Sequence, residues 1–513
     1  MPVPSIRPQH VPAQRIVGLV QRLHDVGLQG ARVHGDADAL VSGITHDSRQ
    51  VRAGDVYVAR AGQHTHGIDH VAQALSAGAT AVLTDPVSAS RASDAGASAV
   101  IEVDDPQSAA GPAAAWIYGD PAQALTIVGI TGTNGKTTTA YLAEAGLRAD
   151  GRRTGLIGTI ETRIDDEVLP SARTTPESTD LQALLALMRE RGVDAVAMEV
   201  SSHALALGRV AGISYAVAVF TNLSQDHLDF HTDMDDYFAA KASLFTPALA
   251  VTGVVCVDDE WGRKLAQVAS IPVTTVGRAA ADWTRVDERV DGGGGRCGLI
   301  DPAGNRHELA VALPGRFNLS NAASAYVALV TAGIDPAAAR AGIAALTAVP
   351  GRMERVDEGQ PFLAVVDYAH TPDAVTTLLE EARSLAAPSG KVLVVLGCGG
   401  DRDRGKRPLM GAAAARNADV AVLTNDNPRS EDPEAILAAM AAGATGEAEV
   451  VVLPDRREAI ALVVQRASSG DVVVIAGKGH EQGQEYADQT LPFDDRVELR
   501  SALRSNGFAA GVA

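Results

Sequence analysis

The feature that most constrains the fold of this chain is a repeated alternation of short apolar runs with Ala- and Leu-rich helical stretches. Each apolar run leads into Gly, Thr, Asp or other polar residues, as in LTIVGITG, AVAMEVSSH, AVAVFTNLS, KVLVVLGCGG, DVAVLTNDNP and DVVVIAGKGH. Continuous Val- and Ile-rich strands separated by helices are typical of parallel sheets covered on both faces. Ligand sites of such sheets lie at the carboxyl ends of the strands, so we expect the polar residues that follow these runs to carry the function.

The length and two changes in composition divide the chain into three regions. With about 150 residues in a typical domain, 513 residues predict roughly three domains. A strand leads into a glycine-rich loop near residue 125, and a Pro-Gly pair interrupts the segment AVPGRMERV near residue 352. We therefore expect domains at residues 1–124, 125–352 and 353–513. Residues 291–298 are predicted to be an exposed hairpin tip, because glycine weakens helix and strand interiors.

Net charge and hydropathy exclude several classes of protein. Lys+Arg 44 against Asp+Glu 63 give a net charge of −19, which argues against a nucleic-acid binder or an anionic-membrane binder. No stretch approaches the roughly 18 uninterrupted apolar residues of a membrane span, and no signal-peptide core is present at the N-terminus. Cys256, Cys297 and Cys398 lie far apart without a CxxC pattern, which fits a reducing compartment. We expect a soluble, cytoplasmic, monomeric protein.

The strongest local signal is the loop GITGTNGKTT at 129–138, between a predicted strand, LTIVGI, and a predicted helix, TTAYLAEAGL. In such a strand–loop–helix, backbone N–H groups and the helix N-terminus face a phosphate chain. Lys136 would reach the terminal phosphates, and Thr137 would hold Mg²⁺. A tight glycine turn with an exposed lysine is the alternative. The predicted ATP contacts here are Gly132, Thr133, Asn134, Gly135, Lys136, Thr137 and Thr138.

The spacing of the glycines narrows the assignment, because Gly129, Gly132 and Gly135 depart from the ordinary GxxxxGK[ST] pattern. TGTNGKTT resembles the loop of the Mur ligases and of the folylpolyglutamate synthetases, which form amide bonds through an acyl phosphate. The resemblance to the Mur ligases runs from residue 40 to residue 485. It rests on motifs in the order seen in one branch of that family: EVSSH (199–203), TNLSQDHLDFH (221–231), FNLSNAASA (317–325), GRMERV (351–356), DYAHTPDA (367–374), GCGGDRDRGKRP (397–408), DNPR (426–429) and GKGHE (477–481).

The resemblance implies a three-domain α/β fold and a reaction. The N-terminal domain would bind a UDP-linked substrate, a central P-loop domain with a parallel sheet would bind ATP, and a Rossmann-like C-terminal domain would bind an amino acid. In this branch ATP phosphorylates the D-Glu carboxylate of UDP-MurNAc-L-Ala-D-Glu, and the amino group of meso-diaminopimelate attacks the acyl phosphate, which extends the peptidoglycan stem peptide. The implied catalytic residues are Lys136, Lys241, His227 and Arg209.

Acids and histidines that follow predicted strands are candidate metal ligands. Glu199 ends the run AVAME, and Asp226 and His227 follow AVAVFTN. Such residues can hold Mg²⁺ beside phosphates, and helix capping is the alternative for the acids. The resemblance implies a magnesium set of Thr137, Glu199, His227 and Lys241, the last as a carbamate derived from CO2. Carbamylation requires a neutral amine and so a depressed lysine pKa, whereas the residues alone predict a solvated surface lysine.

Further substrate contacts follow only from the resemblance. The nucleotide contacts that it adds are Asn318, Asn321, Arg352 and Asp367. The contacts to the UDP-linked dipeptide are Ser48, Gln63, His64, Thr65, Arg173, Thr174, Thr175, Ser201 and Arg209. Leu207 departs from the family, in which a polar residue is common, so no polar substrate contact is expected at that position.

The loop DNPR at 426–429 predicts which amino acid is added. In the resembling branch it marks enzymes that add meso-diaminopimelate, and lysine-adding relatives carry another sequence. Arg429 offers a planar fork for the second carboxylate of diaminopimelate, which lysine lacks. From the residues alone, an Asn-Pro turn with an exposed arginine is the alternative. The implied contacts are Arg402, Asp426, Asn427, Pro428, Arg429, Gly477 and Glu481.

Three other functions remain open at this point. A lysine-adding relative would differ only in its amino acid. A folylpolyglutamate-type ligase would share the loop and the acyl phosphate, but it gives no role to THDSR (45–49), QHT (63–65) or DNPR. A P-loop switch or motor would hydrolyse ATP without an amino acid or a UDP-sugar.

Overall fold

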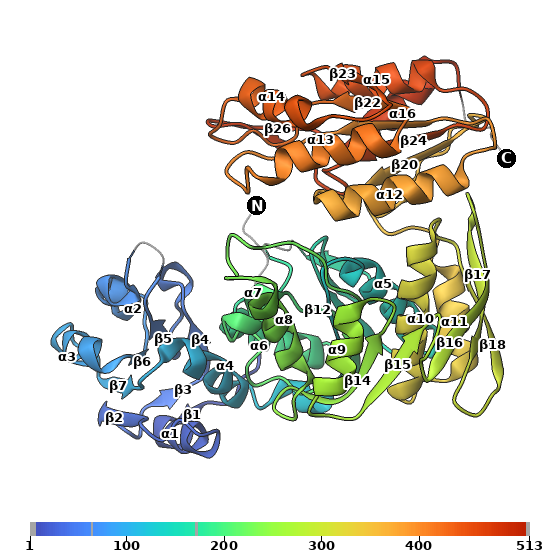
Figure 1. Cartoon of the computed structure of the whole chain (residues 1–513). Coiled ribbons are helices and arrows are strands. Elements are labelled where there is room, and N and C mark those ends of the chain that lie inside the picture. Colours follow the sequence, from blue (N-terminus) through green and yellow to red (C-terminus); the bar gives the residue numbers. More distant parts are fainter. Residues whose placement is uncertain (1–6, 63–64, 170–172, 509–513) are drawn as a thin grey trace.

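The computed structural model describes residues 7–62, 65–169 and 173–508. The chain forms three large β-sheets in sequence order, each packed against helices, which confirms the α/β fold (Figure 1). The N-terminal sheet lies within residues 32–102, the central sheet within 126–311 and the C-terminal sheet within 354–476. Each sheet therefore falls inside one of the three domain ranges proposed from the sequence.

The N-terminal sheet is parallel except at one edge. Its strands are β2 (Arg32–Gly35), β4 (Gly43–Thr45), β5 (Asp55–Ala59), β6 (Ala81–Thr84) and β7 (Ala99–Glu102), and a separate pair is formed by β1 (Gln14–Arg15) and β3 (Leu40–Val41). The order is β2-β7-β6-β5-β4, and only β2 runs antiparallel to its neighbour. The helices are α1 (Ile16–Asp25), α2 (Val71–Ser76), α3 (Pro86–Asp94) and α4 (Pro106–Ile117).

The central sheet contains β8 (Thr126–Thr131), whose apolar residues continue directly into the glycine loop. The other strands are β9 (Thr154–Ile157), β10 (Thr162–Ile164), β11 (Glu167–Leu169), β12 (Ala195–Glu199), β13 (Tyr215–Phe220), β14 (Ala250–Cys256), β15 (Val273–Gly277), β16 (Trp283–Asp291), β17 (Gly294–Ile300) and β18 (Arg306–Val311). The order is β11-β10-β9-β12-β8-β13-β14-β15-β16-β17-β18, with antiparallel pairs confined to the two edges. Because β8 lies between β12 and β13, the residues that follow these three strands meet at one edge of the sheet.

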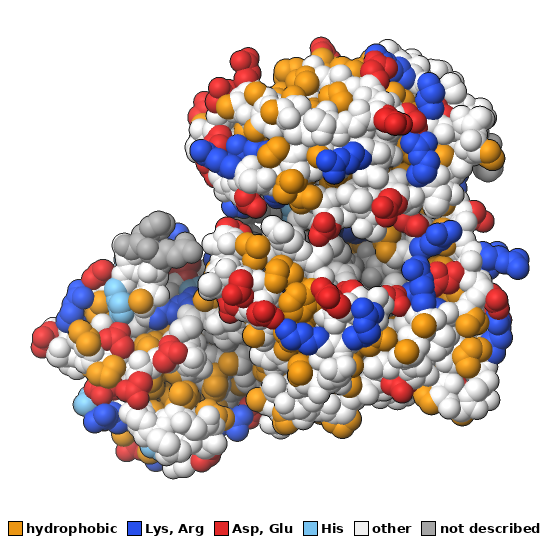
Figure 2. All heavy atoms as spheres, in the orientation of Figure 1, with side chains coloured by type: hydrophobic (Ala, Val, Ile, Leu, Met, Phe, Trp, Pro, Cys, Tyr) orange, Lys and Arg blue, Asp and Glu red, His pale blue; other side chains and the backbone are white. Residues whose placement is uncertain are grey.

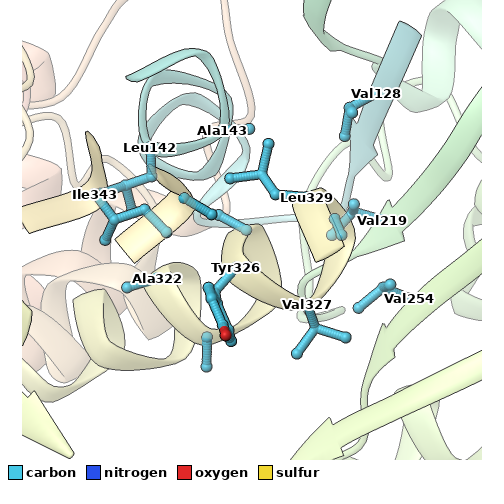
Figure 3. Packing of buried hydrophobic residues seen from close by; sticks show 14 of the residues in the cluster. Val128, Leu142, Ala143, Val219, Val254, Ala322, Tyr326, Val327, Leu329 and Ile343 are labelled. Carbon is cyan, nitrogen blue, oxygen red and sulfur yellow. The ribbon is translucent and has the colours of Figure 1, made fainter. Parts of the chain in front are cut away.

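The helices of the central region include the one predicted after the glycine loop. They are α5 (Lys136–Ala149), α6 (Ser178–Glu190), α7 (Ser202–Ala206), α8 (Met234–Ala242), α9 (Glu260–Val268), α10 (Arg316–Thr331) and α11 (Pro336–Ala345). Figure 3 shows side chains of α5 and α10 packed with strand residues in one cluster: Leu142, Ala143, Tyr326, Leu329, Val128 and Val219. Burying one Leu or Val side chain contributes about 1.5–3 kcal/mol, so this core holds β8 and α5 in a fixed relation and thereby fixes the loop between them.

The expectation of an exposed hairpin tip at residues 291–298 is wrong for most of that segment. The turn spans only the two residues between β16 and β17, and β17 pairs with strands on both sides. A Cβ atom at Gly295 would lie 2.9 Å from the side chain of Leu319, and one at Gly298 would lie 2.6 Å from the guanidinium of Arg306. Glycine occurs in this strand because neighbouring side chains pack directly on its backbone.

The C-terminal sheet has the parallel core of a Rossmann-like domain. Its strands are β19 (Glu354–Arg355), β20 (Leu363–Asp367), β21 (Val392–Leu396), β22 (Val420–Leu423), β23 (Glu449–Val452) and β24 (Val472–Ala476), and β25 (Gly483–Glu485) pairs with β26 (Thr490–Pro492) in a separate hairpin. The order is β19-β20-β24-β21-β22-β23, and only β19 is antiparallel. The helices are α12 (Pro372–Leu385), α13 (Lys406–Asn417), α14 (Pro433–Gly443), α15 (Arg456–Arg466) and α16 (Asp495–Ser505).

The surface and the cysteines agree with the composition. Figure 2 shows acidic and basic side chains interspersed over the visible face. Cys256, Cys297 and Cys398 are buried free thiols. Within the described ranges, none of the helices combines the length and the hydropathy that a bilayer crossing demands.

Candidate functional site

The glycine loop has a backbone that only glycine fits at two positions. Gly132 and Gly135 have φ values of +146° and +86°, in the left-handed region that side chains disfavour. A Cβ atom at Gly132 would meet the hydroxyl of Thr221, and one at Gly135 would meet the side-chain amide of Asn321. The loop therefore approaches neighbouring groups too closely for any side chain, and it presents the N-terminus of α5 at its end.

Lys136 begins α5 and folds back over the loop. Its Nζ donates to the carbonyl oxygens of Gly132 at 3.0 Å and Thr133 at 2.8 Å. Burial lowers the pKa of this ammonium group, and nearby Arg352 acts in the same direction. A cation held beside a helix N-terminus is the arrangement that the sequence predicted for phosphate binding.

Thr137, Glu199 and Arg352 meet beside the loop. The Thr137 hydroxyl donates to Glu199 Oε2 at 3.0 Å, and Arg352 Nη2 donates to the same hydroxyl at 3.2 Å. The guanidinium of Arg352 also lies 4.5 Å from the ring centroid of Tyr368. Glu199 is fixed from its other side by the backbone N–H of Thr159 at 2.8 Å. Side chains of the central and C-terminal regions therefore contact each other at the predicted ATP site.

Lys241 is buried, so the alternative of a solvated surface lysine is wrong. Its side chain is 1% exposed, and its Nζ donates to the carbonyl oxygen of Gly132 at 2.7 Å. The Nζ atom lies 4.5 Å from the ring centroid of Tyr237. Burial, assisted by the positive charge of Lys136, holds the pKa of Lys241 well below its usual value. A neutral amine of this kind is what carbamate formation requires.

His227 lies close to the same group of residues, in a left-handed backbone conformation with φ of +54°. Its ring lies edge-on to that of His203, with 4.8 Å between centroids, and the His203 ring stacks on Phe230 at 4.1 Å. Burial lowers the pKa of His227 to about 4, so its imidazole is neutral at physiological pH. A neutral imidazole is able to bind a metal ion.

A cavity of about 480 Å³, here called the loop cavity, gathers most of these side chains. Its lining from the predicted set is Thr133, Asn134, Gly135, Lys136, Thr137, Thr138, Thr174, Glu199, Ser201, His227, Lys241, Asn321, Arg352 and Asp367. Asn318 lies behind this lining: it is fully buried, donates to the Pro314 carbonyl at 2.7 Å and accepts from Asn321 at 3.2 Å. Asp367 accepts from the backbone N–H of Met353 at 2.7 Å, and burial raises its pKa.

A second cavity of about 1170 Å³, here called the C-terminal cavity, adjoins the first. The predicted amino-acid contacts that line it are Arg402, Asp426, Asn427, Arg429, Gly477 and Glu481. Pro428 does not line it; its carbonyl packs against Gly400. The two cavities share the wall residues Asp226, His227, Tyr368, His370 and Asp373. A group bound in one cavity can therefore face a group bound in the other.

Lys478 is a residue of the C-terminal cavity region that sequence reasoning missed. It is fully buried, and its Nζ donates to Asn427 Oδ1 at 2.8 Å and to Glu481 Oε2 at 3.1 Å. Asn427 donates in turn to Glu481 Oε2 at 2.8 Å. The pKa of Glu481 is raised by burial and by Asp426, while Lys478 opposes that rise. The available signal was the position of Lys478 at the end of a buried strand, inside GKGHE.

Arg429 has a partner that the sequence did not reveal. Its backbone is left-handed, with φ of +53°. Its Nε donates to Glu485 Oε2 at 2.8 Å, and its Nη1 donates to the carbonyl oxygen of Gly400 at 2.8 Å. Arg402, on the facing loop, donates to the carbonyl oxygen of Asp401 at 3.3 Å. The two arginines predicted to contact the amino acid thus line one cavity.

Of the residues predicted to bind the UDP group, Ser48 and Thr65 lie apart from both cavities. Ser48 is buried and donates to the side chain of Gln73 at 2.9 Å, and Thr65 is exposed. Gln63 and His64 lie outside the described residues. Neither Ser48 nor Thr65 lines the loop cavity or the C-terminal cavity.

Arg209 belongs to a cluster of charges centred on Glu177, which sequence reasoning also missed. Glu177 accepts from Arg209 at 2.8 Å, from Arg173 at 2.9 Å and from Arg60 of the N-terminal region at 3.0 Å. Burial lowers the pKa of Arg209. Thr175 lies beside this cluster, where its carbonyl oxygen faces Arg209 Nη1 at 3.5 Å. Several predicted dipeptide contacts thus lie near the junction of the N-terminal and central regions.

Ser201 and Leu207 bracket the short helix α7. The Ser201 backbone N–H donates to the Thr175 hydroxyl at 3.1 Å, and the Ser201 hydroxyl caps α7 by accepting from Ala204 at 3.2 Å. Leu207 ends the helix with its side chain 36% exposed, and its carbonyl oxygen accepts from Gln107 at 2.7 Å. Position 207 therefore supplies a backbone contact to the N-terminal region.

Family comparisons agree with this arrangement. Residues 40–126 match the family model described as Mur ligase family, catalytic domain; residues 130–329 match the Mur ligase middle domain; and residues 351–479 match the Mur ligase, glutamate ligase domain. A UDP-N-acetylmuramoyl-L-alanyl-D-glutamate--2,6-diaminopimelate ligase of Streptomyces avermitilis is 56% identical over 97% of this chain and 98% of its own length. The chain belongs to the Mur ligase family.

Solved structures place the fold of this Mur ligase among related enzymes. A structure of UDP-N-acetylmuramoyl-L-alanyl-D-glutamate--2,6-diaminopimelate ligase superposes with a TM-score of 0.68 and 32% identity, covering 96% of this chain and 99% of that one. The Mycobacterium tuberculosis folylpolyglutamate synthase complexed with ADP has a TM-score of 0.59 and 22% identity, and covers 73% of this chain and 92% of that one. At that identity, the second likeness concerns the fold alone.

Proposed function

We propose that this Mur ligase adds meso-diaminopimelate to the D-Glu carboxylate of UDP-MurNAc-L-Ala-D-Glu, using ATP and an acyl phosphate. The observation that carries the proposal is the shared wall of the two cavities, with the glycine loop on one side and Arg402 and Arg429 on the other. The name of the Streptomyces avermitilis relative at 56% identity supports the choice of substrate. We further propose a cytoplasmic monomer with domains at residues 1–124, 125–352 and 353–513.

The first step activates a carboxylate. One of its oxygens attacks the γ-phosphorus of ATP, ADP leaves, and the resulting acyl phosphate has a good leaving group in place of oxide. Lys136 and the N-terminus of α5 offset the negative charge that moves among the phosphate oxygens. Positioning and charge supply the catalysis, so no covalent enzyme nucleophile is required.

The donor set beside the loop fits magnesium. Thr137 and Glu199 present a hydroxyl and a carboxylate 3.0 Å apart, and buried Lys241 has the lowered pKa that a carbamate needs. Within the described ranges no three His, Cys, Asp or Glu side chains form a ready metal site, so the set also needs His227, the carbamate and phosphate oxygens. When bound, Mg²⁺ would neutralise phosphate charge.

The second step forms the amide. The amino group of the amino-acid substrate, placed in the C-terminal cavity, attacks the acyl carbon across the shared wall; the C–O bond to phosphate breaks, and the amine loses a proton. Asp367 and Tyr368 of the C-terminal region line the loop cavity, so closure of that region around the substrates would exclude water from the acyl phosphate.

Selection of meso-diaminopimelate is assigned to the charged lining of the C-terminal cavity. Arg429 and Arg402 offer guanidinium groups to the carboxylates, and Glu481 offers a carboxylate to an ammonium group. Lysine has no second carboxylate, so the lysine-adding alternative leaves part of this lining without a function. A folate substrate would likewise leave it unused.

Phosphate release tests the proposal against its alternatives. ATP turnover should require both UDP-MurNAc-L-Ala-D-Glu and meso-diaminopimelate and should yield the tripeptide product. Turnover with a folate and glutamate would favour the folylpolyglutamate-type ligase, and turnover with ATP alone would favour a P-loop switch. Equal or higher kcat/KM for L-lysine would favour the lysine-adding relative.

A further inference from the structure

Glu485 occupies one edge of the Arg429 guanidinium, which lines the C-terminal cavity, although Glu485 itself does not line that cavity. Its Oε2 accepts from Arg429 Nε at 2.8 Å, while Arg429 Nη1 is engaged by the carbonyl oxygen of Gly400 at 2.8 Å. We infer that Glu485 is an internal competitor, whose carboxylate the distal carboxylate of the amino-acid substrate displaces from Arg429. This inference rests on the function proposed for the C-terminal cavity, and it adds a residue that sets affinity and selectivity.

The backbone around Glu485 is anchored independently of its side chain. The Arg429 backbone N–H donates to the Glu485 carbonyl oxygen at 3.0 Å, and the Glu485 backbone N–H donates to Asn427 Oδ1 at 3.0 Å. β25 therefore stays attached to the cavity rim when the Glu485 side chain turns away. This anchoring separates a movable carboxylate from the fixed strand that carries it.

Exposure shows which partner of the ion pair is free to move. The Glu485 side chain is 49% exposed, against 24% for Arg429. An ion pair with a half-exposed carboxylate is weak, because water solvates the carboxylate when the pair opens. Displacement therefore requires only that a ligand carboxylate bind Arg429 better than Glu485 does.

Glu481, which lines the C-terminal cavity, already has hydrogen-bond partners of its own. Glu481 accepts from Lys478 at 3.1 Å and from Asn427 at 2.8 Å, and Lys478 is fully buried. Glu485 is the carboxylate that forms an ion pair with Arg429 before the substrate arrives, and the charge of Asp401 also lies close to Arg429. A dicarboxylic substrate replaces Glu485 with an equal charge, so Arg429 stays paired throughout binding.

The same exchange discriminates between two amino acids. The distal carboxylate of meso-diaminopimelate competes with Glu485 for Arg429, whereas lysine carries only the distal ammonium that both amino acids share and has no group that competes. Removing the Glu485 charge should therefore favour meso-diaminopimelate over lysine. Glu485 therefore lowers the affinity for the dicarboxylic substrate, while it keeps Arg429 paired when no substrate is bound.

The test is Glu485→Gln in the full-length enzyme. We expect the KM for meso-diaminopimelate to fall by about two- to fivefold, as for removal of a weak competing ion pair, with kcat changed less than twofold. The kcat/KM for L-lysine should stay equal or fall. Asp488→Asn is the matched control, because it removes one exposed charge from the same hairpin, and its KM should equal that of the wild type.

Glu485→Ala tests whether Glu485 competes with the substrate for Arg429 or instead holds Arg429 in place. Both Glu485→Gln and Glu485→Ala should keep the thermal unfolding midpoint of the wild type and lower the KM for meso-diaminopimelate. A KM for meso-diaminopimelate that is unchanged or raised in both overturns the inference, and a lowered midpoint with a raised KM would show that Glu485 supports Arg429. Failure of the proposed function would be visible in the wild type alone, as equal or better use of L-lysine.

Discussion

The side-chain nitrogen of Lys241 and that of Lys136 both donate to one carbonyl oxygen, that of Gly132, at 2.7 Å and 3.0 Å. Two ammonium groups do not share so small a buried space without penalty, so one of them favours the neutral form. Lys241 has the pKa held well below its usual value, and a neutral amine is the species that CO2 carbamylates. The proposal of a carbamate at Lys241 rests on this pair of contacts.

Lys241→Ala is expected to reduce ligation to background, because the variant loses the anion proposed to hold magnesium. Formate or acetate added to the assay should restore part of the activity by occupying the same space. Lys241→Arg should stay inactive with either additive, since a guanidinium does not form this carbamate. A ligand-bound structure with unmodified Lys241 directed to solvent would contradict the role.

Lys136→Ala should lower kcat/KM at least about a hundredfold, equivalent to roughly 3 kcal/mol of lost transition-state stabilisation. The thermal unfolding midpoint should stay close to that of the wild type, because the side chain contacts loop carbonyls and contributes no apolar core. Lys391→Ala, at an exposed lysine of the C-terminal region, is the control and should keep full activity. Retention of a large share of activity by Lys136→Ala at saturating ATP would remove Lys136 from the mechanism.

Arg429→Lys should narrow the preference for meso-diaminopimelate over L-lysine by roughly tenfold, because an ammonium keeps the charge but loses the planar fork. Competition between the two amino acids in one reaction, read by product mass, measures the ratio directly. Arg466→Lys, at a distant partly exposed arginine paired with Glu449, should leave the ratio unchanged. If Arg429→Lys left this ratio unaltered, a residue other than Arg429 would have to determine the choice of amino acid.

The ion pair of Arg456 and Asp495 is a test of stability without reference to substrate. Both side chains are fully buried, with Nη2 and Oδ2 2.7 Å apart. Arg456→Met should lower the free energy of unfolding by about 3–5 kcal/mol, because it leaves Asp495 buried without its partner. The adjacent Arg457→Met, which breaks an exposed pair with Glu498, should lower it by about 0–1 kcal/mol. Denaturant titration compares the two, and equal effects would refute the burial argument.

His480 should make stability depend on pH. Burial lowers its pKa to about 4 from an ordinary value of 6.5. Between pH 6.5 and pH 4 the unfolded chain takes up a proton that the folded chain does not, so the contribution of His480 is complete above pH 6.5 and is lost as the pH falls towards 4. His480→Gln should flatten this part of the unfolding curve, whereas His70→Gln, at an exposed histidine, should not.

Much of the fold could be predicted because each buried strand is a continuous apolar run. β8, β12, β21, β22 and β24 lie within the apolar runs of the sequence, and β13 begins one residue before its run. β17 was not predicted because its glycines make room for the side chains of Leu319 on α10 and Arg306 on β18, elements that follow it in the chain. The glycine-rich composition of this segment predicts a flexible turn, but the packing of neighbouring side chains on its backbone makes it a strand.

The residues of the candidate site also fall into two groups: those whose geometry is fixed by local sequence, and those that depend on partners far away in the chain. Lys136 and Thr137 were identifiable because a loop between a strand and a helix fixes their geometry locally. The burial of Lys241, and the contacts of Glu177 and Glu485, depend on partners 109, 117 and 56 residues away: Gly132, Arg60 and Arg429. A lone lysine or glutamate in a helix or strand carries no sign of such a partner, so these contacts could be found only in the structure.

The residues that the two cavities share imply a second role for the bound amino acid, beyond supplying the amine. Asp226, His227 and Tyr368 border both cavities. On the proposed function, an amino acid bound in the C-terminal cavity would therefore cover the side of the loop cavity that faces it and would shield the acyl phosphate from solvent. The amino acid that supplies the nucleophile would then also exclude water from the reacting carbonyl group. Futile ATP hydrolysis should be greatest when the C-terminal cavity is empty, and a diaminopimelate analogue without the reacting amine should preserve the activated dipeptide rather than consume it.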